Sequence, residues 1–325
     1  MDRPNPNVLA LFGKVTAIAV ILGACMSFLP LGLPFLAPFL ALPPAYLVAK
    51  AGVRQGLAMA AVVGGLMWFV VGTGMASVIL LLLVALGVAL GLALRRRWSF
   101  GAALAAMATG TLTAFVLWGL LLWQLGLTLS ALREDAFSSI EQARELYVSM
   151  GVSAGTGDLA AEQLRRLVDV LPYLVPGLLG MGVILLAASS IGLAYVFFPR
   201  FKDKVDVGLA LSRFRVHWVM AYVFIAGLAM IVFGRGESVW HSVMLYAGID
   251  LLLVVQTLFF LQGLAVVRWY VNTRRTPSAA GTALYVAAVV GQALLQLTGL
   301  LGLFDTWLDC RRRFALKSPH TGASR

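Results

Sequence analysis

The residues of this chain that could do chemistry are a few polar side chains inside otherwise apolar segments. The first is Asp250, which stands in the run Tyr-Ala-Gly-Ile-Asp-Leu-Leu-Leu. A carboxylate is costly in hydrocarbon, so its presence there indicates an ion or proton site, or a counter-charge for a substrate. The alternative is that Asp250 lies near the outer end of its helix and is hydrogen-bonded to a neighbouring helix.

Glutamines form a second set of candidates in the same part of the chain. Gln256 and Gln262 share an apolar segment with Asp250, and Gln292 and Gln296 lie in the next one. Gln292 and Gln296 are one helical turn apart, so they share a helix face. These side chains favour a polar cavity between two helices, with interhelical hydrogen bonding as the alternative. The candidates for binding a substrate or an ion are Asp250, Gln262, Gln292 and Gln296.

A third set follows the last apolar segment and contains Asp305, Trp307, Asp309 and Arg311. Asp305 and Asp309 are one turn apart, and each can pair with Arg311 or Arg312 at the end of a helix. This motif indicates either a partner-docking site or a helix end whose charges satisfy one another.

Motifs of known enzyme classes are missing from the sequence. It shows no Ser/His/Asp set, no His/Glu zinc motif, no phosphate-binding loop and no paired carboxylates. The histidines (His217, His241 and His320) and the cysteines (Cys25 and Cys310) are scattered without metal-ligand spacing. We therefore expect no catalytic residues, no metal and no cofactor, and we do not expect an enzyme.

The elements that must position these residues are long segments without charge. A helix needs about 20 apolar residues to cross a bilayer, and charges are costly within it. The first two uncharged segments are each long enough for two helices joined by a turn. The uncharged segments are 15–49, 55–94, 98–132, 170–199, 216–234, 251–267 and 276–304. The pattern predicts an all-α, polytopic membrane protein.

Composition supports this class of protein. Hydrophobic residues make up 61% of the chain and charged residues 12%, about half the usual share of a soluble domain. The net charge of +11 comes from Lys and Arg in short loops beside apolar segments, which is typical of orientation signals in membrane proteins. We therefore expect the lipid bilayer as the partner and no nucleic acid.

The segments divide into about nine predicted transmembrane helices and one polar insertion at 130–170. In the insertion, apolar residues recur at three- and four-residue steps, which predicts an amphipathic helix ending near 151–157 and covering the bundle or the membrane surface. A second helix would follow before the sixth span. The predicted spans are 8–29, 31–49, 53–71, 75–94, 101–129, 171–198, 217–234, 242–267 and 280–304.

Orientation follows from the basic residues, which occupy alternate loops. They place the amino terminus and the basic loops in the cytoplasm and the insertion 130–170 outside, with the protein in a bacterial inner membrane. The last span, 280–304, has basic clusters at both ends, at 274–275 and at 311–313. A single span cannot have both ends inside, so by count the carboxyl terminus is expected outside.

The order of elements carries a resemblance to known membrane proteins. A first span, a short proline-rich second span, two glycine-rich spans, a basic stop, a long fifth span, an insertion and a sixth span resemble the S components of energy-coupling-factor transporters and MreD. The whole chain resembles the YybS-like bacterial membrane proteins through residues 261–266 (LQGLAV) and 302–311 (GLFDTWLDCR). The resemblance implies an S-component-like six-span core at 1–200 and a three-span extension at 201–325.

These observations lead to two functional hypotheses. The first is a small-solute binding or transport protein, with its site among the first six spans beneath the insertion 130–170. The second is a non-transporting scaffold resembling MreD, which recruits other envelope or cytoplasmic proteins through its basic loops, with other membrane proteins as candidate partners.

Overall fold

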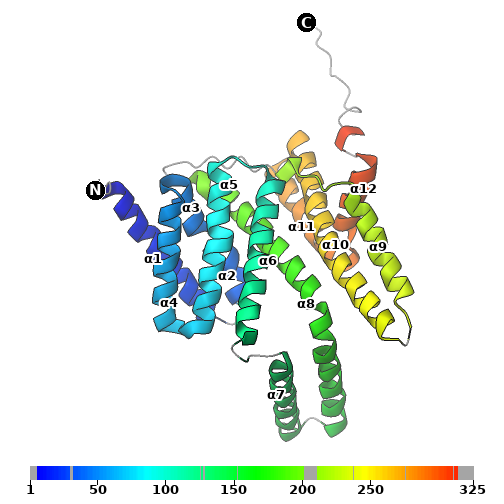
Figure 1. Ribbon diagram of the computed structural model, residues 1–325. Helices are drawn as coiled ribbons and strands as arrows, with labels where there is room; N and C mark the ends of the chain where they lie inside the picture. The colour runs from blue at the N-terminus through cyan, green and yellow to red at the C-terminus, as the bar shows by residue number, and fades with distance from the viewer. Residues whose placement is uncertain are drawn as a thin grey trace.

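The computed structural model describes residues 6–29, 32–124, 126, 129–151, 153–200, 211–236, 238–274, 276–309 and 311–313. The described part of the chain contains helices and no strand, which confirms the all-α polytopic fold (Figure 1). By length and composition, six of its helices can cross a membrane. They cover Leu9–Phe28, Val53–Arg95, Phe100–Gln124, Gly155–Phe197, Val239–Thr273 and Ser278–Leu295.

The first part of the bundle follows the predicted order. It contains α1 (Pro6–Phe28), the short α2 (Gly32–Leu40) and α3 (Leu42–Ala51), α4 (Val53–Leu82), the π-helical turn η1 (Leu83–Val88), α5 (Ala89–Arg95) and α6 (Phe100–Gln124). Gly72 interrupts α4 with φ 78° and ψ 175°. Glycine adopts this conformation without steric cost, so the chain reverses there and the predicted turn between two spans is confirmed (Figure 1).

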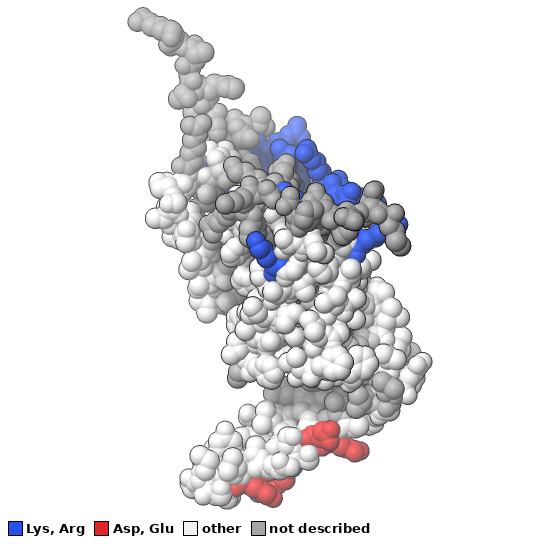
Figure 2. Space-filling model, turned by 90° about the vertical axis from the view of Figure 1, so that its left-hand side faces the viewer, with Lys and Arg blue, Asp and Glu red and all other residues white. Residues whose placement is uncertain are grey.

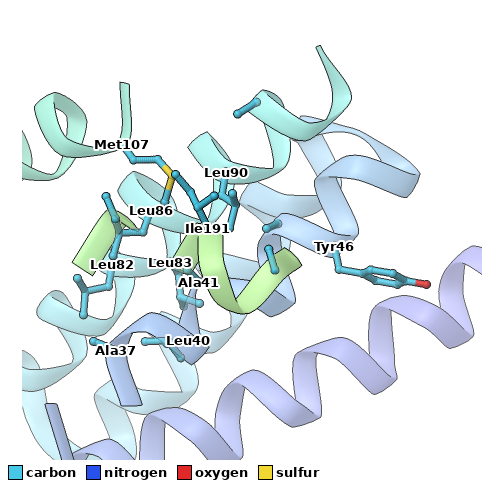
Figure 3. Packing of buried hydrophobic residues seen from close by; sticks show 14 of the residues in the cluster. Ala37, Leu40, Ala41, Tyr46, Leu82, Leu83, Leu86, Leu90, Met107 and Ile191 are labelled. Carbon is cyan, nitrogen blue, oxygen red and sulfur yellow. The ribbon is translucent and has the colours of Figure 1, made fainter. Parts of the chain in front are cut away.

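Close helix contacts in this part depend on two glycines. A Cβ atom on Gly87 would lie 2.1 Å from Cγ of Pro44, and one on Gly91 would lie 2.5 Å from Cβ of Val48. Small residues at these positions let η1 and α5 approach α3 closely. Buried apolar side chains fill the space around this contact, as Figure 3 shows for Ala41, Leu83, Leu86, Leu90, Met107 and Ile191.

The insertion forms a helical hairpin. It consists of α7 (Leu129–Ser149) and the beginning of α8 (Ala154–Phe197), with a reversal at Gly151, whose φ is 92°. The predicted amphipathic helix is confirmed, but α7 packs on α8 and the pair extends beyond the bundle instead of covering it (Figure 1). The helix predicted before the sixth span is not separate from that span, because α8 continues through Pro172 and Pro176 as one helix.

Ion pairs at partly exposed positions link the two helices of this hairpin. The ion pairs between its two helices are Arg133–Asp169, Arg144–Asp158 and Arg165–Glu141. The hydrogen bond to Asp158, and then that to Glu141, raises the pKa of Arg144 above its usual value. The apolar stripe of α7 faces a groove that Ala160, Ala161 and Leu164 of α8 also line. The stripe therefore faces α8 rather than the bundle, and Tyr147 in it stays 56% exposed.

The last third of the described chain begins with the short turns η2 (Phe198–Arg200) and η3 (Leu211–Arg213). The helices α9 (Val219–Phe233), α10 (Val239–Thr273), α11 (Ser278–Leu295) and α12 (Leu297–Leu308) follow. The predicted last span, 280–304, is wrong as a single helix. Gln296 adopts the left-handed conformation, with φ 55° and ψ 23°, and divides the segment into α11 and α12.

The helices α11 and α12 form a hairpin that turns back halfway along α10. The first of them begins where α10 ends, and α12 then runs beside α10 in the same direction. Gly299 lies against Gln256, and three residues later Gly302 lies against Phe259. Since Gln256 is at the middle of α10, the reversal at Gln296 lies at half the length of that helix.

The α11–α12 hairpin places the end of the described chain beside Arg213 and Arg215, at the end of the molecule that we call the basic face. Arg311 donates hydrogen bonds to the backbone oxygens of Ser212 and Phe214, which neighbour the basic residues Arg213 and Arg215. The carboxyl terminus, expected opposite the basic loops, lies outside the described residues, so that expectation stays a prediction; the last described residues, 311–313, lie beside the segment that carries Arg213 and Arg215. Two half-length helices return the chain to the face it left, so basic clusters at both ends of 280–304 no longer conflict.

The balance of charge differs between the two ends of the molecule, since acidic residues outnumber basic ones in the α7–α8 hairpin. Figure 2 shows Lys and Arg side chains at one end and Asp and Glu side chains of the α7–α8 hairpin at the other. The division into units at 1–200 and 201–325 stays a prediction. One buried apolar cluster contains residues from both units, including Phe198 and Leu261.

Candidate functional site

Three predicted residues meet in a buried polar network at the basic end of α10 and α12. Nε2 of Gln262 donates to Oδ2 of Asp305 over 3.1 Å, and Nη2 of Arg311 donates to the same oxygen over 2.7 Å. All three residues are at most 5% exposed. Hydrogen bonds and opposite charges together satisfy these groups, which would otherwise be costly to bury.

The same network fixes the segment 211–216 to the helices. Arg311 donates to the carbonyl oxygens of Ser212 and Phe214, each over 2.8 Å. Oε1 of Gln262 accepts a hydrogen bond of 2.8 Å from the backbone N–H of Val216. Gln262, Asp305 and Arg311 therefore have partners on several sides, and their arrangement positions this segment. We call these three residues the Arg311 network.

Two glycines permit the helix contact on which the Arg311 network depends. A Cβ atom on Gly302 would lie 2.0 Å from the carbonyl oxygen of Phe259, and one on Gly263 would lie 2.0 Å from that of Thr298. Glycine lets the two helix backbones come this close. The approach of α12 to α10 brings Asp305 within reach of Gln262.

The remaining residues of the predicted docking motif behave differently. Asp309 pairs with Arg215 over 2.8 Å, at a partly exposed position, rather than with Arg311 or Arg312. Trp307 is 52% exposed and lies outside the Arg311 network. The predicted pairing of Asp305 with Arg311 is confirmed, and a partner that docks at this motif stays a prediction.

Gln292 and Gln296 lie at the turn between α11 and α12. Oε1 of Gln292 accepts a hydrogen bond of 2.8 Å from the backbone N–H of Gly299, and Oγ1 of Thr298 donates to the carbonyl oxygen of Ala288 over 2.5 Å. The start of a helix leaves N–H groups without partners, which is costly in hydrocarbon, and Gln292 satisfies one of them. Gln296 is exposed at the turn itself.

Asp250 lies apart from the other candidates, where α10 crosses α8. A Cβ atom on Gly177 would lie 2.4 Å from Oδ1 of Asp250, so the carboxylate sits directly on the α8 backbone. Oδ1 is inaccessible to solvent and has no hydrogen-bond partner among the described residues. Twelve residues separate Asp250 from Gln262, about 18 Å along a helix. Its role as an ion or proton site stays a prediction.

A cavity of about 700 Å³ lies next to the segment 211–216, between α6, α8, α10 and α11. Apolar side chains such as Leu185, Phe260 and Leu264 form most of its wall. Its polar side chains are Ser189, Tyr195, Ser212, Arg268, Asn272 and Tyr285. We call it the Arg268 cavity. It lies at the basic end of the bundle, whereas the predicted site was beneath the insertion at the acidic end.

Arg268 gives this cavity its charge. Its guanidinium lies over the ring of Tyr195, 5.7 Å from the centroid, an arrangement that orients the cation. No acidic side chain is among the described residues that line the cavity, and Arg268 has no ion-pair partner among the described residues. A half-buried arginine without a counter-charge in an apolar wall can bind an anionic group.

Sequence reasoning missed this arginine as a binding residue because it counted Arg268 only as an orientation signal. One signal was present: Arg268 directly follows the uncharged segment 251–267 and stands six residues before the next basic residue. Tyr195 of α8 and Tyr285 of α11 also line the cavity, and no sequence spacing connects them with Arg268. Among the described residues, no group of His, Cys, Asp and Glu could hold a metal ion.

Comparisons with known proteins identify one family. The family described as Predicted membrane protein (DUF2232) matches residues 17–306. No curated protein and no solved structure matches the chain. The resemblance to YybS-like proteins, S components and MreD stays a prediction.

Proposed function

Because the chain belongs to the DUF2232 family of predicted membrane proteins, we propose a function within the membrane, namely binding of a small amphipathic anion in the Arg268 cavity. The observation that carries this proposal is the position of Arg268, a guanidinium without an acidic partner among the described residues, in a mainly apolar cavity of about 700 Å³. Transport of the bound solute would be the wider form of the same function.

The walls of the cavity define the class of solute. Pockets of several hundred Å³ bind small molecules through mostly apolar contacts and a few polar groups that fix orientation. Here the apolar wall fits a hydrocarbon body, and Arg268 fits a single carboxylate or phosphate at one end of it.

Binding should depend on the charge of Arg268. We expect decanoate to raise the melting temperature of the purified full-length protein, whereas decanol, with the same chain length and no charge, should not. Arg268→Gln should abolish the shift, because glutamine keeps polarity but loses the cation. Arg274→Gln removes an exposed arginine at the end of the same helix and should keep it. Equal shifts with decanoate and decanol, or an unchanged shift in Arg268→Gln, would contradict the proposal.

A scaffold is the second candidate function, and the α7–α8 hairpin favours it. The hairpin extends beyond the bundle and carries apolar side chains that are more than 60% exposed, among them Leu146, Met150, Leu159 and Leu167 (Figure 1). Large apolar side chains exposed on one protruding element are typical of surfaces that contact a protein or a membrane. Specific co-purification of another membrane protein, together with no effect of decanoate, would favour this candidate.

We also propose that the basic face lies in the cytoplasm of a bacterial cell and that the α7–α8 hairpin lies outside. The difference in charge balance between the two ends supports this orientation through the positive-inside rule (Figure 2). In a variant without the native cysteines Cys25 and Cys310, a cysteine at Ser138 should react with an impermeant maleimide in intact cells. Cysteines at Arg96 and Arg312 should be protected.

Labelling at Arg312 distinguishes the α11–α12 hairpin, which returns the chain to the basic face, from a single last span, which would end on the opposite face. Both Arg96 and Arg312 should become reactive when the cells are opened, which controls for burial. Labelling of Arg312→Cys together with Ser138→Cys in intact cells would contradict the return of α12 to the basic face. Labelling of Arg96→Cys with protection of Ser138→Cys would reverse the whole orientation.

A further inference from the structure

A second cavity, of about 410 Å³, lies on the basic face between two loops that are far apart in sequence. One loop joins α5 to α6, and the other is the segment 211–216. Three arginines line the cavity: Arg97 from the first loop, and Arg213 and Arg215 from the second. We call it the three-arginine pocket. None of its arginines lines the Arg268 cavity, although Phe100 lines both cavities.

The two loops are held in place by buried contacts. The rings of Phe100 and Phe214 meet edge to face, with 5.2 Å between their centroids. Both residues are at most 8% exposed. Arg311 fixes the carbonyl oxygen of Phe214, which stands between Arg213 and Arg215. The three arginines therefore line the pocket from anchored backbone positions.

The backbone at Arg97 is also fixed. The N–H of Arg97 donates to the oxygen of Leu94 and that of Trp98 to the oxygen of Ala93, a pattern that ends α5 and puts Arg97 in the left-handed region at φ 52°. Glycine is the residue best suited to this position. The substitution Arg97→Gly therefore removes the guanidinium while favouring the same backbone.

The charges in the pocket are not balanced. Arg215 pairs with Asp309, but neither Arg97 nor Arg213 has an acidic partner among the described residues. Like charges that line one cavity repel one another, and an anion bound in the cavity reduces the repulsion. Arginine offers a planar set of donors that matches the oxygens of a phosphate. Basic pockets on the cytoplasmic side of membrane proteins bind phosphate-bearing headgroups for this reason.

We propose that the three-arginine pocket binds a phosphate group at the membrane surface. The phosphate belongs either to the headgroup of an anionic phospholipid or to a soluble phosphate ester, and both offer the same oxygens to the three guanidiniums. The proposal is independent of the solute in the Arg268 cavity, because it depends on other residues.

Whether the phosphate belongs to a lipid headgroup can be tested with the full chain in phosphatidylcholine nanodiscs. These contain a small fraction of phosphatidylglycerol or of diacylglycerol with the same acyl chains, and native mass spectrometry identifies the lipids retained after release. The wild type should retain phosphatidylglycerol in preference to diacylglycerol. The double variant Arg97→Gly/Arg213→Gln should lose about tenfold or more of this preference, since it lacks two charge-assisted contacts.

The soluble source is tested by the melting temperature in sodium phosphate and in sodium chloride of equal ionic strength. Stabilisation by phosphate that the double variant loses, without retention of phosphatidylglycerol, would assign the pocket to a soluble phosphate ester. Retention of phosphatidylglycerol would assign it to a lipid. Either result supports a phosphate site, and the absence of both in the wild type overturns it.

A matched pair of variants separates the pocket from the general charge of the basic face. Arg312→Gln/Arg313→Gln removes the same two charges from exposed positions on that face and should leave retention unchanged. An equal loss in this pair would overturn the proposal. Asp309→Asn should act in the opposite direction and increase retention, because it releases Arg215 while asparagine tolerates the left-handed backbone at φ 45°. Reduced retention in correctly folded Asp309→Asn would also contradict the site.

Discussion

Replacement of Arg311 by alanine should lower the free energy of unfolding by about 3–5 kcal/mol, because it leaves the Asp305 carboxylate buried without its cation. The side chain of Asp305 is 1% exposed, so bulk solvent does not screen its charge in the native protein. The substitution also releases the carbonyl oxygens of Ser212 and Phe214. Thermal or denaturant unfolding of the purified protein in one detergent measures the loss, and a lower abundance in the membrane should accompany it.

Two further variants show whether the buried pair causes this loss. Arg312→Ala removes a neighbouring exposed arginine and should change stability by about 0.5 kcal/mol or less. The double variant Asp305→Leu/Arg311→Met leaves no unpaired charge and should recover part of the stability lost in Arg311→Ala. If Arg311→Ala were as stable as Arg312→Ala, the Arg311 network would not fix the segment 211–216.

The second large effect is expected at the contact between α10 and α12. Gly302→Ala puts a Cβ atom where the carbonyl oxygen of Phe259 now lies 2.0 Å away, and this neighbour is backbone rather than a side chain that can move aside. The two helices must separate, which lengthens the hydrogen bond between Gln262 and Asp305. We expect the free energy of unfolding to fall by about 1–3 kcal/mol, the usual cost of overpacking. The lowered melting temperature in detergent measures it.

Gly119→Ala is the matched control for this substitution. Gly119 lies within α6, and a Cβ atom there meets nothing within 4 Å. Alanine should therefore leave stability unchanged or raise it by about 0.5–1 kcal/mol through its better helix propensity. A similar loss in both variants would mean that glycine matters for helix flexibility in general, and that the close contact between Gly302 and Phe259 is not the cause.

The helical membrane fold could be predicted from the sequence because its signals are local. Runs without charge mark the membrane helices, and a bilayer accepts few other structures over such lengths. Gly72 and Gly151 mark reversals because glycine adopts positive φ without steric cost. The amphipathic spacing in 130–170 likewise predicted α7, since one helix face repeats every three or four residues.

The hairpin of α11 and α12 could not be predicted in this way. The segment 276–304 is uniformly free of charge, so its composition is the same for one span and for two half-length helices. The break at Gln296 depends on contacts with another helix, where Gly263 and Gly302 allow α12 to lie against α10. The basic clusters at both ends were the only sequence sign of a return to the same face.

The candidate site also has a part that could be predicted from the sequence and a part that could not. The sequence by itself identified Asp305 with Arg311, because residues near one helix end can pair locally. Only the tertiary structure added Gln262 to that pair, separated Asp250 from it, and gathered the arginines of the three-arginine pocket from two distant loops. Apolar runs and turns follow from the residues within one segment, whereas a cavity and its charges depend on which helices pack together, and that is decided by close contacts between backbones far apart in the chain.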